Sequence, residues 1–366
     1  MTAPNFLSLD GAQIVAEMVA DYQSRTGRPL YPAQAEMFLI NAFAYRELLI
    51  RQQMQALIQQ MLVDFSSAPG LDYLGALLGV ARLPASAATC TLRFTLVSGH
   101  GDVVIPAGTR VSSTDGRVTF ATAQNVDVAT GDTTADVEAF ASSIGAAGNG
   151  YVAGDVANIL DPQPFITTAE NLGTTSGGAD SESDESLRTR IKLAPSQFSN
   201  AGSSGAYRYW ALTASPAIVD VAVTSPTPGE VDVFPLMADG STTPTPILDL
   251  VASILNDEKI RPLTDTVVVL SPTVVDYDIE VELVAYTDAD VVQLQADVAA
   301  TLAEYAAKKQ RLLGQDIVFN QLIAASTTPL VYNPTVIQPA GDIEIAPTEV
   351  ARVGTITVTV ISTTDG

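Results

Sequence analysis

A helical pattern over residues 33–66 constrains this chain more than any other feature. Residues 33–68 contain neither Gly nor Pro, so no strong helix breaker interrupts the stretch. About 34 helical residues at about 1.5 Å each form a rod of about 50 Å. Helices of globular proteins average about 11–12 residues, so one of this length needs packing partners along it. Its second half carries an apolar face with i, i+3, i+4 spacing, made of Met54, Leu57, Ile58, Met61, Leu62 and Phe65.

Two sources of that packing surface are open at this point. Residues 1–83 contain two shorter helical patterns, AQIVAEMVADYQSRTG and LDYLGALLGVARL, which could cover the long helix as an intrachain hairpin. Partner chains could instead supply the surface, because the apolar face is long and the local helices are short. We take partner binding as the main hypothesis. The candidate interface residues are Tyr45, Leu49, Met54, Leu57, Ile58, Met61, Leu62, Phe65, Leu74 and Leu77.

The acidic composition argues against several classes of function. The chain has 366 residues, with 41 Asp or Glu against 18 Lys or Arg, and a formal net charge of −23. Such a surface repels phosphate groups, so we expect no nucleic-acid binding and no membrane-surface role. No run of about 18 apolar residues predicts membrane insertion. The N-terminus lacks a secretory pattern, so we expect the chain to start out in the cytoplasm.

Residues 90–172 predict a small all-β unit. Leu92, Phe94 and Leu96 alternate with polar residues, as a half-buried strand requires. A hairpin turn is predicted at DG within RVSSTDGRVTF. The polar stretch of residues 172–186 is expected to be a linker whose end, SDES, caps a helix through LRTRIKL.

The rest of the chain alternates between helical and strand patterns. We expect helices at YRYWALTAS, PILDLVASILNDEKI and residues 288–309, and strands at IVDVAV, EVDVFPL, YDIEVELVAY and VGTITVTVIST. This order predicts two small α/β sandwiches. The predicted fold class is therefore α+β multidomain, with an N-terminal helical arm, a small all-β unit and C-terminal mixed α/β sandwich domains.

The stretch NDEKIRPLTDTVVVLSP, residues 256–272, specifies a turn with no catalytic group beside it. Pro262 is expected to end the preceding helix, because proline removes a backbone donor and the residue before it favours an extended conformation. The chain is then expected to turn into a strand over residues 266–270. The structural turn residues are Arg261, Pro262, Leu263 and Asp265.

No group of residues predicts catalysis or metal binding. His100 is the only histidine, without the partners that triads and most zinc sites need, and is interpreted as a plain loop residue. Cys90 is the only cysteine and is interpreted as a buried inert thiol. GNGYVA matches a dinucleotide fingerprint, but no helix is expected after it, so a turn is favoured. DSESDE lacks calcium-loop spacing and is interpreted as helix capping. We predict no catalytic, metal or cofactor-binding residues and no cofactor.

A series of motifs runs in one order through nearly the whole chain. The first is AYRELLIRQQMQALIQQMLVDFSSAPGLDYLGALLGVARL, followed by VVIPAGTRV, VTFAT and GAAGNGYVAGDV. Next come GGADSESDESLRTRI, SSGAYRYWALTASPAIVDVAV, PGEVDVFPL, RPLTDTVVV and RLLGQDIVFNQLIAA. This ordered set resembles the baseplate J-like wedge proteins of contractile-tailed phages and related contractile injection particles. The likeness is weakest after about residue 338.

The resemblance implies a structural subunit of a baseplate wedge and not an enzyme. It implies pairing with a second copy, binding to a second wedge tail protein, and contacts with sheath-proximal and hub baseplate proteins. The wedges would form a ring around the hub whose rearrangement triggers sheath contraction, in a virion tail baseplate or an equivalent contractile particle assembled in the host cytoplasm. We expect a helical arm over residues 1–85, a β-rich domain over 86–175, a linker and helix cap over 176–189, and α/β domains over 190–275 and 276–366.

Two other classes of function stay open. A tail-associated hydrolase would need a pair of carboxylates, and the 41 acidic residues offer many pairs. A carbohydrate-binding module would need an exposed aromatic platform on the β unit.

Overall fold

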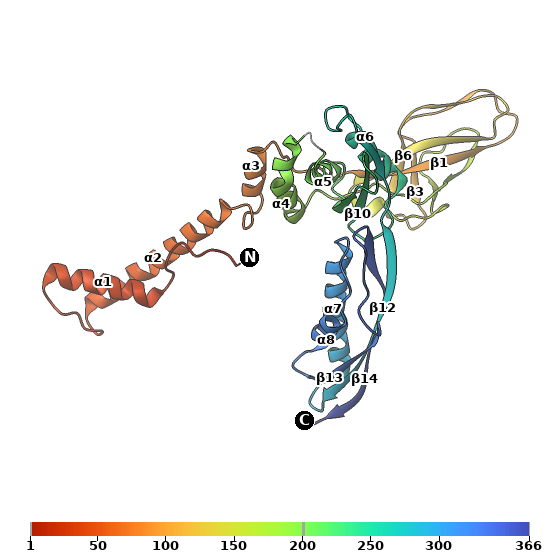
Figure 1. The fold of residues 1–366 in the computed structure, drawn as a ribbon. Helices are drawn as coiled ribbons and strands as arrows, with labels where there is room; N and C mark the ends of the chain where they lie inside the picture. Colours follow the sequence, from red (N-terminus) through yellow and green to blue (C-terminus); the bar gives the residue numbers. More distant parts are fainter. Residues whose placement is uncertain (1, 200–201, 366) are drawn as a thin grey trace. The chain divides into compact units, whose positions relative to one another are not determined.

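The computed structural model describes residues 2–199 and 202–365. Figure 1 shows an N-terminal helical region, a nearly closed barrel-like sheet and C-terminal α/β parts, which confirms the predicted fold class. The chain divides into two compact units. The first comprises the chain up to Ala81 together with Leu187–Lys192, and the second comprises Arg82–Ser186 and the chain from Leu193 onward.

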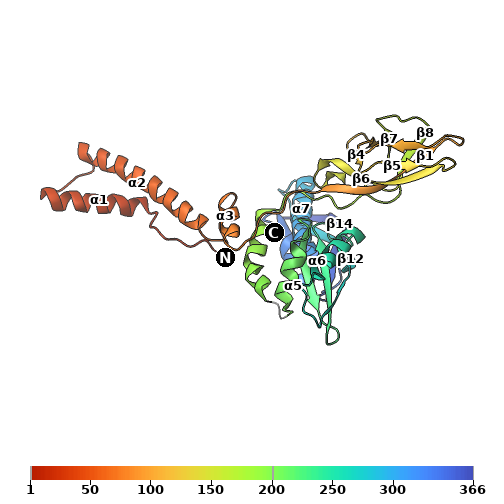
Figure 2. The same ribbon diagram turned by 90° about the horizontal axis from the view of Figure 1, so that it is seen from above.

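The first unit begins with a helical hairpin. Helix α1 (Gly11–Thr26) starts at Asp10, whose side chain accepts hydrogen bonds from the backbone N–H groups of Ala12 and Gln13. It ends at Gly27 in the left-handed region, at φ 68°. Helix α2 (Ala35–Gln60) then runs back beside α1, as both views show (Figures 1 and 2). A short helix, α3 (Gly70–Ala76), follows after several turns.

Helix α2 is shorter than the sequence predicts. It ends at Gln60 and not near residue 66. Beyond it the chain forms turns, in which the Ser66 amide donates to the Leu62 carbonyl. The guanidinium of Arg188, on helix α4 (Asp184–Leu193), donates to the carbonyl oxygens of Val63 and Ser66, each at 2.8 Å. Both carbonyls therefore accept from a charged donor that lies far away in the sequence. These charge-assisted hydrogen bonds stabilise the turns, so the helix does not continue through residues 61–66.

The second unit begins with the barrel-like part. Its six-stranded sheet has the order β7-β3-β4-β6-β1-β8, and a two-stranded sheet pairs β2 with β5. Phe94 and Phe120 are fully buried in its core. The predicted hairpin is confirmed, since Gly116 at φ 72° joins antiparallel β3 and β4. The strands are β1 (Ala87–Leu96), β2 (Val103–Ile105), β3 (Arg110–Ser113), β4 (Thr119–Thr122), β5 (Val126–Val128), β6 (Thr134–Ile144), β7 (Val156–Ile159) and β8 (Ile166–Asn171).

The next part is a three-stranded sheet covered by helices. The sheet has the order β11-β10-β9, with β10 and β11 parallel and β9 and β10 antiparallel. Val233, Val251 and Leu255 are fully buried in its core. Its elements are η2 (Ala194–Phe198), α5 (Ser204–Leu212), β9 (Ile218–Thr224), β10 (Glu230–Met237), α6 (Thr245–Leu255) and β11 (Thr266–Val269).

Helix α6 also ends earlier than the sequence predicts, because it stops at Leu255 and not at Pro262. The Asn256 side-chain amide donates to the Ala252 carbonyl at 2.9 Å, and the Asp257 carboxylate accepts from the Lys259 amide at 2.8 Å. Short polar side chains that bond to nearby backbone in this way end helices. The predicted strand after the turn is present as β11.

The C-terminal part is a second α/β arrangement. Its sheet has the order β13-β12-β14, with β12 antiparallel to β13 and parallel to β14. Val281, Leu283 and Leu302 are fully buried between sheet and helices. Its elements are β12 (Thr273–Tyr286), α7 (Val291–Gln310), α8 (Phe319–Ser326), β13 (Val331–Gln338) and β14 (Glu349–Thr364).

Candidate functional site

A line of large apolar side chains follows α2 and is exposed along its length. At about 100° per residue, these positions fall within about 60° of arc on one side of the helix. Their exposed fractions range from 47% for Met54 to 72% for Met61. We call this set the outer stripe. Its members are Leu39, Phe43, Ile50, Met54 and Leu57 of α2 and Met61, the residue that caps the end of this helix.

Helix α1 covers a different side of α2. Ile14 of α1 and Ala44 of α2 are buried, and Leu48 lies against Gly11 at the start of α1. The Gln55 side chain is also buried, where it accepts from the Phe6 amide at 2.9 Å and donates to the Pro4 carbonyl at 2.6 Å. The hairpin alternative is therefore correct for one side of α2, and it leaves the outer stripe uncovered.

The structure separates the predicted interface residues into groups. Met54, Leu57 and Met61 belong to the outer stripe, whereas Leu49 and Ile58 are half-buried on α2. Tyr45 is exposed on another side of α2, and Leu62 and Phe65 are half-buried in the turns after this helix. Leu74 is half-buried in α3, and Leu77, just after α3, is 81% exposed. The prediction of one continuous helical face through Phe65 is wrong, because the helix ends before it.

Sequence reasoning missed the first half of the stripe. Leu39, Phe43 and Ile50 are 56–64% exposed and share the stripe with Leu57. A heptad step backward from Leu57 reaches position 50 and then position 43, so the signal was present in the sequence.

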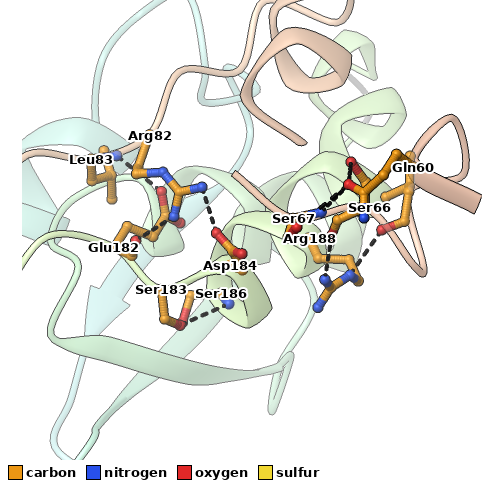
Figure 3. A network of polar contacts seen from close by, with 11 residues as sticks. Gln60, Ser66, Ser67, Arg82, Leu83, Glu182, Ser183, Asp184, Ser186 and Arg188 are labelled. Carbon is orange, nitrogen blue, oxygen red and sulfur yellow. Dashed lines mark hydrogen bonds and ion pairs between the residues drawn. The ribbon is translucent and has the colours of Figure 1, made fainter. Parts of the chain in front are cut away.

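Polar contacts hold the turns between α2 and α3, as Figure 3 shows. The Gln60 side-chain oxygen accepts from the Ser67 amide at 2.9 Å. Arg188 donates to the Val63 and Ser66 carbonyls on the same segment. Lys192 of α4 forms an ion pair with Asp64. Basic side chains of α4 therefore set the path of the chain at the end of the outer stripe.

The acidic stretch DSESDE also makes structural contacts in the second unit (Figure 3). The Arg82 guanidinium donates to the Glu182 carbonyl and to the Asp184 carboxylate, each at 2.7 Å. The Glu182 carboxylate accepts from the Leu83 amide at 2.9 Å. Ser183 accepts from the Ser186 amide at 3.2 Å, which confirms the predicted helix cap. The contacts of Glu182 and Asp184 with Arg82 and Leu83 were not evident from the sequence.

The predicted structural turn is held by its own residues and by Tyr207 of α5. Arg261 donates to the Asp265 carbonyl at 2.9 Å, and the Tyr207 hydroxyl donates to the Asp265 carboxylate at 2.7 Å. The Asp265 amide donates to the Pro262 carbonyl at 3.2 Å. Leu263 is fully exposed at the tip. The turn orients the entry into β11.

The other residues singled out in the sequence lie in the β unit. Cys90 is buried in β1, and burial raises the pKa of its thiol to about 12, so the reactive thiolate is disfavoured. Residues 148–153 run from the end of the short 3-10 helix η1 (Ala146–Gly148) through a loop into a turn at Ala153, and the next element is β7 and not the helix that a dinucleotide site needs, as predicted. His100 lies in a loop as predicted, and it is 3% exposed with a partner at each ring nitrogen.

Within residues 2–199 and 202–365, no group of three His, Cys, Asp or Glu side chains could hold a metal ion. Seven described carboxyl groups have a lowered pKa, as for Asp161, whose pKa the Arg110 guanidinium lowers to about 2. No helix in the described chain has the length and apolar character needed to cross a bilayer.

Comparison with known proteins gives four matches to domain families, in chain order. They are the Baseplate J-like N-terminal domain at residues 36–89, the Baseplate J-like protein barrel domain at 91–178, the Baseplate J-like central domain at 199–271 and the Baseplate J-like protein C-terminal domain at 277–359.

Two individual proteins are also similar. Baseplate protein J of Escherichia phage P2 is 32% identical over 194 residues, which are 53% of this chain and 64% of that protein. A chain in the cryo-EM structure of the anti-feeding prophage baseplate is similar over 93% of this chain and 90% of that one, with 14% identity and a TM-score of 0.42. Because four Baseplate J-like domains follow one another from residue 36 to residue 359, the chain belongs to the baseplate J-like protein family.

Proposed function

We propose that this chain is a structural subunit of a contractile tail baseplate. It pairs with a second copy and with a second tail protein in a wedge, and wedges close into a ring around the hub. Rearrangement of this ring triggers sheath contraction, and the subunit also meets sheath-proximal and hub proteins. Its place is the virion tail, after assembly in the host cytoplasm. Family membership and the relative named baseplate protein J support the baseplate assignment.

The outer stripe is the observation that carries the assembly part of this proposal. Six large apolar side chains, each at least 47% exposed, follow one side of α2. Burial of such a side chain stabilises a contact by about 1.5–3 kcal/mol, and exposed contiguous apolar surface marks interaction sites. The heptad spacing of Phe43, Ile50 and Leu57 suits packing against another helix. We assign the stripe as the wedge-forming contact of the helical arm.

Leu57→Asp tests this assignment. Leu57 is 68% exposed, so we expect the variant to fold and to melt like the wild type. In the complex, a buried unpaired carboxylate would cost several kcal/mol and abolish association. Gln52→Asp is the matched control, because it adds the same charge on the opposite side of the same helix. The measurement is co-purification with co-expressed tail proteins and sedimentation of the full-length chain, together with thermal melting followed by circular dichroism.

Two outcomes would contradict the assignment. If Leu57→Asp assembles like the wild type, the outer stripe does not bind the partner. If Leu57→Asp and Gln52→Asp fail equally, added charge and not the apolar stripe causes the loss.

The two alternative functions find less support. A glycoside hydrolase needs a carboxyl group with a raised pKa as its general acid, whereas seven described carboxyl groups, Asp161 among them, have a lowered pKa. A carbohydrate platform needs adjacent exposed rings. Phe140 and Phe165 are exposed on the β unit, and among the ring contacts of the described residues Phe165 meets His100 and not Phe140.

A further inference from the structure

His100 connects two loops at one end of the barrel-like part. It lies in the loop between β1 and β2, and its ring is nearly inaccessible to solvent. Its Nδ1 atom is 2.5 Å from the Gly101 carbonyl oxygen in the same loop. Its Nε2 atom is 2.6 Å from the carbonyl oxygen of Asp132, in the loop between β5 and β6. Both ring nitrogens therefore face oxygens that can only accept hydrogen bonds.

This geometry distinguishes between the two charge states of the ring. Neutral imidazole carries one N–H and one lone pair, whereas imidazolium carries two N–H donors. With a neutral ring, one nitrogen lone pair would face a carbonyl lone pair at hydrogen-bond distance. Only the imidazolium form of His100 can donate to Gly101 and Asp132 together.

The charged groups around the ring favour the same form. Asp102 lies in the β1–β2 loop and Asp132 in the β5–β6 loop, and both carboxylates attract the imidazolium. The hydrogen bonds to the Gly101 and Asp132 carbonyls, with these carboxylates, raise the pKa of His100 above its usual range. Asp102 also accepts from the backbone and hydroxyl groups of Thr130, at 2.9 and 2.8 Å, so it joins the same two loops.

A third loop, before β8, meets the other two at this place. The Phe165 ring centroid is 6.2 Å from that of His100, and the Phe165 carbonyl accepts from the Val97 amide at 2.9 Å. Phe165 has φ 70°, a conformation that residues other than glycine rarely adopt and that persists where surrounding contacts hold it. Asp161 of this loop is paired with Arg110.

We propose that His100 forms a pH-dependent link between two loops. Its imidazolium joins the β1–β2 loop to the β5–β6 loop, and deprotonation of the ring breaks this link. Because the pKa of His100 is higher in the folded state, the protonated ring stabilises the folded loops. This stabilisation is fully present below the ordinary histidine pKa of about 6.5 and is lost as the pH rises through the folded value. The loops therefore loosen on the alkaline side.

Proton NMR tests this pH-dependent link in the full-length chain, and no variant is needed. His100 is the only histidine, so its Cε1–H resonance is assigned at once. We expect its titration midpoint to lie above that of a histidine reference peptide in the same buffer. A midpoint at or below that of the peptide would overturn the proposal.

Hydrogen exchange then tests the loops. Protection of the Thr130 and Val97 amides, corrected for the intrinsic pH dependence of exchange, should fall several-fold through the same pH range. The Phe94 amide in β1 serves as the internal reference, and His100→Gln should remove the pH dependence. Constant protection of both loop amides through the titration, or an unchanged pH dependence in His100→Gln, would show that the ring does not hold the loops.

Discussion

Close contacts at single residues fix the path of the chain after α2, and one of these contacts is at Gly75. A Cβ atom at this position would lie 2.8 Å from the Val80 carbonyl oxygen and 3.1 Å from Cδ1 of Ile191. Nearby, the buried Arg190 side chain donates to the Ala81 carbonyl at 2.6 Å. Close approach and a charge-assisted hydrogen bond thus fix α3 and the segment after it within the first unit.

Gly75→Ala should therefore destabilise the first unit. Because one contact is with backbone oxygen, which cannot rotate away, we expect a loss of about 1–3 kcal/mol in the free energy of unfolding. Gly341→Ala is the control, since a Cβ there meets nothing within 4 Å. Denaturant unfolding followed by circular dichroism measures both variants. Equal stability of Gly75→Ala and wild type would show that this segment can shift without cost.

At the scale of elements, features that depend on neighbouring residues are predictable from the sequence, whereas features that depend on residues far along the chain are not. The cap at Ser183 and the turn at Gly116 depend on neighbouring residues, and both predictions are confirmed. The end of α2 depends on Arg188, which lies 122 and 125 residues from its carbonyl partners, so no pattern in α2 could indicate it. The outer stripe was only half recognised because its heptads extend back beyond the stretch with the clearest periodicity.

Arg188→Ala tests the role of that distant contact. The variant leaves the Val63 and Ser66 carbonyls without their charged donor, and hydrogen bonds to charged groups contribute about 1.5–3 kcal/mol each. We expect a lower melting temperature of the full-length chain and faster amide exchange over residues 62–67. Arg188→Lys is the conservative control and should recover only part of the loss, because lysine cannot donate in the same fork. Unchanged exchange in Arg188→Ala would mean that Gln60 and Ser67 hold the turns without it.

At the scale of the whole molecule, the net charge opposes the association that the outer stripe favours. Each copy carries a formal charge of −23, so two copies repel one another. The stripe itself contains no charged residue, although Arg46 and Glu47 lie between Phe43 and Ile50 along α2. Apolar contact is not weakened by salt, whereas repulsion between exposed charges is screened.

Self-association of the full-length chain should therefore become tighter as salt is added. The screening length falls from about 30 Å at 0.01 M to about 8 Å at 0.15 M ionic strength, which removes most of the long-range repulsion. Sedimentation velocity over this range should give a decreasing dissociation constant for the wild type and for Gln52→Asp. Leu57→Asp should remain unassociated throughout, because screening does not restore the apolar contact. Association that weakens with salt would instead identify ion pairs as the main attraction, and the outer stripe would then not be the dominant contact between copies.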